Sequence, residues 1–384
     1  MHESSLSVSI LNLVKNMLGA GMLSIPLAML LCGDIRLGVL LLCLAGLCSG
    51  LSFMMVGSCC RITGERSYRG VCSALLGDQF IWLVDCVVLA NSAIACTAIM
   101  VLIGDFSHRA ISGLTGLDVS RSLCLLLAGS GIVTPLCMLS SFSALKYSSV
   151  LGLVATGYAF AYVAVDGLSH QGRPIDGQVT VSVLKAWALF CTSFLCHYNA
   201  PVFFYQLESP SPKRFRIMTA TAFSTVCIVY IIFGLAGYRI FGHDLKGNVL
   251  ESYTQSTVPL LFAWAAMAFS LIFTYPLVFA SLKESMNELV PGGQTSLSVI
   301  LAVVLTMVAA LIEDDVSLFN AIKGATSACI LAFVIPALLV IKATQSTQRL
   351  LSSTRFSRVS VFGARMLLVI GGSLGLASVV YLMT

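Results

Sequence analysis

The most informative segment of this chain reads Asn12-Leu13-Val14-Lys15-Asn16-Met17-Leu18-Gly19-Ala20-Gly21. It lies inside an apolar run, residues 6–32, that is long enough to cross a bilayer as one helix. Two amides, a cation and a Gly-Ala-Gly step are unsuited to lipid, and Pro26 follows in the second half of the run. Irregular backbone at that depth must be buried in protein or line a cavity. The segment therefore predicts a spanning helix that is broken around a small polar ligand.

The composition predicts an all-α polytopic membrane protein. Of 384 residues, 58% are hydrophobic and only 10% are charged, and the mean hydropathy is +0.94. Soluble domains carry about 25% charged residues, and a β-barrel would show short alternating segments. We expect eleven spans, at residues 6–32, 37–60, 81–104, 122–140, 147–166, 183–206, 217–240, 259–282, 296–312, 317–341 and 363–383. The connections are short, so the chain is predicted to be a single transmembrane domain over residues 1–384.

The distribution of basic residues predicts the orientation. Thirteen Lys and Arg fall in loops on the side of the N-terminus and seven in loops on the other side, while Lys15 and Lys323 lie within spans. Cytoplasmic loops carry the excess of positive charge. We expect a cytoplasmic N-terminus and a C-terminus on the outer or lumenal side. The sequence is compatible with the plasma membrane and with the membrane of an acidic organelle.

The sixth predicted span, 183–206, is interrupted in the same way as the first. Its centre reads Cys196-His197-Tyr198-Asn199-Ala200-Pro201. The two interrupted spans occupy matching places if residues 6–166 and 183–341 are two five-helix halves, with residues 363–383 as an eleventh helix. Paired interruptions at matching positions indicate an inverted-repeat secondary transporter with a midplane site. Free N–H groups there suit a carboxylate and free carbonyl groups suit an ammonium group, so the site favours an amino acid.

Four segments, in order along the chain, resemble the amino acid/auxin permease family, and most of all its sodium-coupled neutral amino acid transporters. They are Ser9–Asn12 with Gly19–Pro26, Phe194–Pro201 with Tyr205–Glu208, Phe233–Gly242, and Lys323–Ala328 with Pro336. The resemblance implies a LeuT-like fold: a five-plus-five inverted repeat with broken helices 1 and 6, plus an eleventh helix. It also implies a sodium-binding role for Asn12, and a role for Thr274 in completing such a site from the eighth helix.

Candidate site residues follow from the two interruptions and from polar residues in other spans. The candidate substrate-binding residues are Asn16, Gly19, Ala20, Gly21, Met22, Asn91, His197, Tyr198, Asn199 and Ala200. The candidate ion-coupling residues are Asn12, Lys15, Ser270 and Thr274, with sodium, if it is the ion, at Asn12 and Thr274. The candidate gate residues are Glu208, beside Lys213, Arg214 and Arg216, and Lys323, which we expect to pair with Glu313, Asp314 or Asp315 or to reach the interface.

Lys15 departs from the family pattern, in which this position is usually small or neutral. A buried ammonium beside a cation site can take the place of the ion or carry a proton. Lys15 therefore favours proton coupling or a sodium-independent carrier, whereas Asn12 and Thr274 favour sodium. The alternative is that Lys15 extends to the membrane interface.

The predicted function is secondary active transport of a small or medium neutral amino acid by alternating access. No acidic residue lies at the centre of a span, so a cationic side chain would have no counter-charge. The alternatives are an amino acid sensor on the same fold and a sodium-independent carrier or exchanger of cationic amino acids. No enzyme motif or metal-ligating cluster is present, and we expect no cofactor beyond a coupling sodium ion or proton. The expected partners are the amino acid and the lipid bilayer, with no nucleic acid.

Overall fold

The computed structural model describes residues 4–138, 145–170, 182–290, 295–349 and 358–383 and is almost entirely helical. The α-helices are α1 (Leu6–Met17), α2 (Ile25–Leu31), α3 (Ile35–Thr63), α4 (Tyr68–Leu76), α5 (Ile81–Thr115), α6 (Arg121–Ala128), α7 (Thr134–Cys137), α8 (Leu145–Ser169), α9 (Val183–Ser193), α10 (Ala200–Gln206), α11 (Pro212–Phe241), α12 (Val258–Leu289), α13 (Ser296–Ile312), α14 (Val316–Lys323), α15 (Ile335–Arg349) and α16 (Arg358–Met383). The 3₁₀ and π segments are η1 (Ala20–Ser24), η2 (Asp78–Phe80), η3 (Gly129–Val133), η4 (His197–Asn199), η5 (Gly242–Asp244), η6 (Val249–Glu251), η7 (Gly324–Ala328) and η8 (Ile330–Val334).

Within the described residues, seven helical segments are long and apolar enough to cross a membrane, or eight if the bent first helix is counted as one span. Large apolar side chains such as Leu40, Leu47 and Leu305 face outward, as expected against lipid. Helices also lie at the other three predicted spans. However, Arg121–Cys137 and Ser296–Ile312 are shorter, and the third is divided between α9 and α10. The prediction of a polytopic helical protein is confirmed, whereas the number of eleven stays a prediction.

The first helix is broken where the sequence predicted. α1 ends at Met17, Gly19 is extended (φ −141°, ψ −157°), and the second half is bent by 52° from the first. Pro26 lies in the first turn of α2, where its missing N–H removes no helical hydrogen bond. The glycine and not the proline therefore interrupts the helix.

The second interruption, between α9 and α10, begins earlier than the sequence predicted. α9 ends at Ser193, and Phe194 and Cys196 already depart from helical geometry. Pro201 lies in the first turn of α10, as Pro26 does in α2. Pro201 therefore begins a new helix and does not itself interrupt a continuous one.

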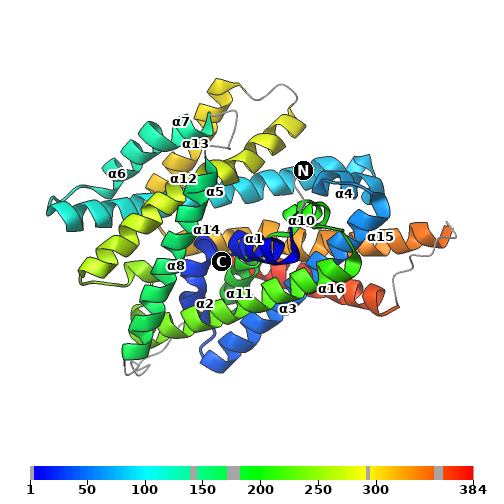
Figure 1. Ribbon diagram of the computed structural model, residues 1–384, viewed down its shortest axis with the longest axis horizontal. Coiled ribbons are helices and arrows are strands. Elements are labelled where there is room, and N and C mark those ends of the chain that lie inside the picture. The colour runs from blue at the N-terminus through cyan, green and yellow to red at the C-terminus, as the bar shows by residue number, and fades with distance from the viewer. Residues whose placement is uncertain (1–3, 139–144, 171–181, 291–294, 350–357, 384) are drawn as a thin grey trace.

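The helices around the two interruptions form two groups (Figure 1). α5 packs along α12 and also against α6 and α13, while α11 packs against α3 and against both halves of the first helix. α1 lies in the middle of the molecule, near the place where the groups meet. The hydroxyl of Tyr230, on α11, lies 2.7 Å from the Met17 carbonyl and 2.9 Å from the Ser193 carbonyl. One side chain therefore joins the ends of α1 and α9.

Candidate functional site

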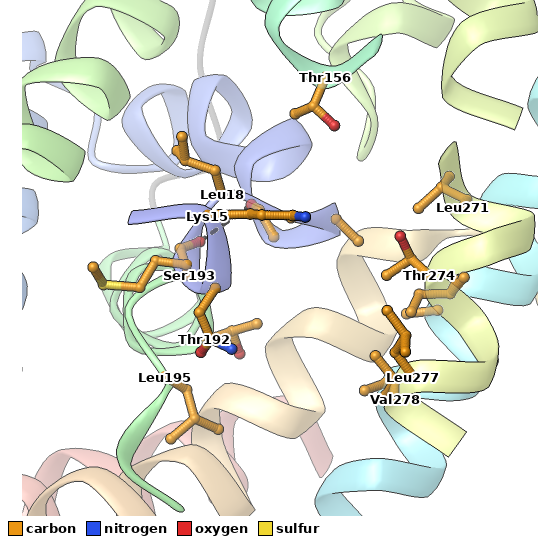
Figure 2. A pocket seen from close by; sticks show the side chains of 18 of the residues that line it. Lys15, Leu18, Thr156, Thr192, Ser193, Leu195, Leu271, Thr274, Leu277 and Val278 are labelled. Carbon is orange, nitrogen blue, oxygen red and sulfur yellow. Dashed lines mark hydrogen bonds between the residues drawn. The ribbon is translucent and has the colours of Figure 1, made fainter. Parts of the chain in front are cut away.

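A cavity of about 400 Å³ lies at the two interruptions, where the first helix meets α9 (Figure 2). Its walls come from α1, η1, α5, α8, α9, η4, α12 and α14. It is large enough for a small polar molecule and contains both apolar and polar side chains. The predicted residues that line it are Asn12, Lys15, Asn16, Gly19, Ala20, Gly21, Asn91, Tyr198, Asn199, Ser270, Thr274 and Lys323. The structure therefore brings together twelve residues that the sequence had singled out from five spans.

The cavity opens on the side of the break where α1 lies. Asn12, Asn16 and Gly19 line it and are exposed, whereas Leu23 and Ile25, just beyond the break, are fully buried. On that far side Ser24 donates a hydrogen bond to the Gly247 carbonyl (2.8 Å). The conformation is therefore open on one side of the break and closed on the other.

Two lysines give the cavity a positive charge. Lys15, on α1, extends into the cavity in the direction of α12, on which Thr274 lies (Figure 2). Lys323, at the end of α14, also lines the cavity. Among the described residues that line the cavity there is no aspartate or glutamate. A ligand with a carboxylate is therefore favoured, and an additional cationic group on that ligand is disfavoured.

The hydroxyl groups of α12 bond to nearby backbone in this conformation. Thr274 donates to the Ser270 carbonyl at 2.8 Å, and Ser270 donates to the Gly152 carbonyl of α8 at 3.2 Å. Each hydroxyl keeps lone pairs with which it can accept a hydrogen bond or ligate a cation. These contacts hold both side chains at the cavity.

Three of the predicted substrate-binding residues do not line the cavity. His197 is fully buried and turns toward α3, where its Nε2 lies 2.8 Å from the Ser52 hydroxyl and 3.0 Å from the Ser49 carbonyl. Met22 and Ala200 are buried in the helix packing. The sequence could not separate His197 from Tyr198 because adjacent residues in an irregular turn point in different directions. The structure places Tyr198 and Asn199 at the cavity instead.

The two predicted gate residues lie in different surroundings. Glu208 forms an ion pair with Arg214 (3.6 Å), and both side chains are substantially exposed. Lys323 lines the cavity, and among the described residues no ion pair joins it to Glu313, Asp314 or Asp315. Asp315 caps α14 by accepting hydrogen bonds from Ser317. Of the two alternatives for Lys323, the pairing with these acidic residues is therefore not formed in this conformation, and the side chain lies at the cavity.

Sequence reasoning missed a polar group on the far side of the break. Asn320 is one turn before Lys323 on α14 and lines the cavity with it. Its side-chain amide donates to the Ser24 hydroxyl (3.3 Å), and its main-chain carbonyl accepts from the Thr192 hydroxyl (2.7 Å) on α9. The three-residue spacing from Lys323 was the available signal, because residues i and i+3 share a helix face.

Comparison with known proteins identifies the family of this chain. Residues 2–378 match the family described as transmembrane amino acid transporter protein. The chain is 25% identical over 363 residues to human solute carrier family 38 member 8, covering 86% of this chain and 83% of the relative. It is 25% identical over 363 residues to human sodium-coupled neutral amino acid transporter 7 (87% and 78%). It is 26% identical over 305 residues to vacuolar amino acid transporter 7 of Saccharomyces cerevisiae (75% and 60%).

Proposed function

The chain belongs to the transmembrane amino acid transporter family, and we propose that it moves a small or medium neutral amino acid by secondary active transport, coupled to a gradient of sodium or protons. The observation that carries the proposal is the cavity at the two interrupted helices, which is open on one side and closed on the other. A site between broken helices serves alternating access when one helix group moves against the other. As a member of a transporter family, the chain is not an enzyme.

We propose that the ten predicted spans before α16 form the five-plus-five inverted repeat of a LeuT-like fold, with α16 as an eleventh helix. The two interruptions support this arrangement, since they come at corresponding positions in the two halves of the chain. The moving group would contain the first helix, α3, the α9–α10 pair and α11. The proposed orientation has the N-terminus in the cytoplasm, so the open side of the cavity would face the cytoplasm.

The charge of the cavity supports a neutral substrate over a cationic one. Lys15 and Lys323 would repel the side chain of lysine or arginine, whereas either can attract the substrate carboxylate. The backbone of the Gly19–Gly21 step lies at the same cavity. The proposed arrangement therefore has the carboxylate near the break and the lysines, with the neutral side chain against the apolar wall that contains Met267 and Leu271.

Uptake of radiolabelled amino acids into proteoliposomes tests this function. The full chain is reconstituted, and a sodium gradient and a proton gradient are imposed separately, with empty liposomes as the control. We expect one of the gradients to drive accumulation of neutral amino acids. Selective uptake of lysine or arginine would contradict the proposed substrate class, and equal uptake with and without each gradient would contradict coupled transport.

A further inference from the structure

The loop between α11 and α12 covers the closed side of the break. Its segment η6 contacts η1, and Val249 and Leu250 of η6 are fully buried. The loop is fixed to the first helix by the hydrogen bond from Ser24 to Gly247, and to α12 by a hydrogen bond from the Trp264 indole to the Leu250 carbonyl (3.1 Å). Movement of this loop would therefore uncover the side of the cavity that is closed here.

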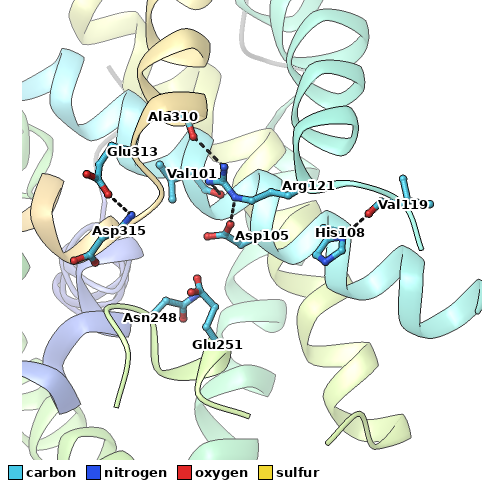
Figure 3. Close-up of polar contacts among 10 residues, drawn as sticks. All are labelled: Val101, Asp105, His108, Val119, Arg121, Asn248, Glu251, Ala310, Glu313 and Asp315. Atoms are coloured by element: carbon cyan, nitrogen blue, oxygen red, sulfur yellow. Dashed lines mark hydrogen bonds and ion pairs between the residues drawn. The ribbon is translucent and has the colours of Figure 1, made fainter. Parts of the chain in front are cut away.

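The same loop places Glu251 against Asp105 of α5 (Figure 3). Asp105 is only 6% exposed, and its Oδ1 accepts a hydrogen bond from the Arg121 Nε. Its other oxygen, Oδ2, is buried without a hydrogen-bond partner among the described residues. Glu251 accepts a hydrogen bond from the Asn248 amide (3.0 Å) through Oε1, which leaves its second oxygen available. A buried acceptor without a donor is unfavourable, and so are two carboxylates in contact.

The surrounding charges offset the repulsion within this pair only in part. Arg121, at the start of α6, is held by Asp105 and by the Ala310 carbonyl of α13 (3.0 Å). Arg109, one turn after Asp105 on α5, attracts Glu251 but also stacks on Trp264 of α12 at 5.4 Å. Other titratable groups also lie near the loop. Asp315 of α14 accepts a hydrogen bond from Ser317, and Asp166 of α8 accepts one from Tyr253. His243, Asp244 and Lys246 belong to the loop itself. A proton on the pair would remove the remaining repulsion.

We propose that Glu251 and Asp105 hold one proton between them, with protonated Glu251 donating to Asp105 Oδ2, and that loss of this proton releases the loop from α5. This hydrogen bond would give the buried Oδ2 the donor that it lacks. Burial and the neighbouring Asp105 carboxylate raise the pKa of Glu251 to about 8, so the proton is retained at neutral pH. The consequence for opening the cavity rests on the proposed transport function, whereas the proton site itself does not.

Thiol labelling measures the release directly. Val249 is replaced by cysteine in the full chain, which is inserted in nanodiscs so that both faces are accessible, and a membrane-impermeant maleimide is added at pH 7 and pH 9. The parent chain gives the background from its fourteen cysteines, and the exposed position of Ser256→Cys corrects for the effect of pH on maleimide reactivity. With a pKa of about 8 for Glu251, we expect corrected labelling of Val249→Cys to rise about tenfold between these pH values.

The matched variant is Glu251→Gln, whose amide imitates the protonated acid and can donate to Asp105. We expect labelling of Val249→Cys in this background to stay low at both pH values. Asp105→Asn is the second variant. Infrared spectra should show a protonated carboxyl band in the parent that Glu251→Gln lacks and that is weaker in Asp105→Asn, where Glu251 is still buried. Labelling that rises equally in the parent and in Glu251→Gln would overturn the proposal, as would a parent without the band. Neither readout requires transport, so failure of the transport assay leaves this test intact.

Discussion

The Ser193 hydroxyl donates a hydrogen bond to the Gly21 carbonyl at 3.1 Å, so the two interrupted helices touch at their breaks. A Cβ atom on Gly21 would lie 3.2 Å from the Ser193 Cα, which is closer than nearly all real contacts of this kind. The close approach of α9 therefore favours a glycine at this position, and the Gly21 carbonyl completes the contact.

Gly21→Ala should separate these two breaks. We expect a lower thermal midpoint and a strong loss of uptake, because the added methyl meets backbone that cannot rotate away. Gly19→Ala is the matched control, since a Cβ there meets nothing within 4 Å. Midpoints measured in detergent for both variants test this, and equal midpoints would show that the contact does not constrain residue 21.

Tyr230→Phe should loosen both interrupted helices at once. The substitution leaves the buried carbonyl groups of Met17 and Ser193 without this donor, which costs about 1–3 kcal/mol. Tyr158→Phe is the control, because its hydroxyl also bonds a carbonyl, that of Pro259, but at an exposed position. We expect the thermal midpoint to fall clearly in the first variant and little in the second. A larger fall in Tyr158→Phe would contradict the role given to Tyr230.

Lys15→Met should change the ion dependence of uptake. If the ammonium group takes the place of a coupling cation, its removal leaves Asn12 and the α12 hydroxyls to bind sodium from solution. We expect sodium to stimulate uptake by this variant about tenfold or more above its effect on the parent. Lys213→Met, at an exposed position on α11, controls for loss of charge alone. If uptake depends on sodium and on pH identically in the parent and in Lys15→Met, Lys15 takes no part in coupling.

Stability should fall as the pH rises toward 8 and beyond. The folded state raises the pKa of Glu251 from 4.5 to about 8, so between these values it binds a proton that the unfolded state has released. The stabilising contribution is complete below 4.5 and is lost as pH rises through 8. Thermal midpoints measured from pH 5 to pH 9 should therefore decline less in Glu251→Gln than in the parent. Parallel declines would contradict a proton at this position.

The sequence predicted the parts of the site that lie on continuous helix faces or at glycine steps. Asn12, Lys15 and Asn16 recur at helical spacing, and Gly19 interrupts the helix that carries them, so their common cavity followed from local pattern. The orientation of His197 did not, because the turn before α10 is irregular and its partners lie on α3.

Pairings between residues far apart in the chain also could not be predicted from the sequence. Glu251 and Asp105 are separated by 146 positions; Asp105 alone resembles an ordinary residue at the end of a span, and Glu251 alone resembles an ordinary loop residue. Only packing of the α11–α12 loop on α5 brings the two carboxyl groups together. The same applies to Asn320, whose contact with Ser24 crosses 296 positions.

The most direct test of the central claim, that amino acids pass through the cavity at the first break, is uptake by Gly19→Leu. Gly19 lines the cavity and has open space around it, so a leucine there should fill the cavity without straining the fold. Gly372→Leu, at an equally open position on α16, is the matched control. We predict that Gly19→Leu keeps the parent thermal midpoint and loses uptake, while Gly372→Leu transports normally. Uptake at the parent rate by Gly19→Leu would contradict the claim.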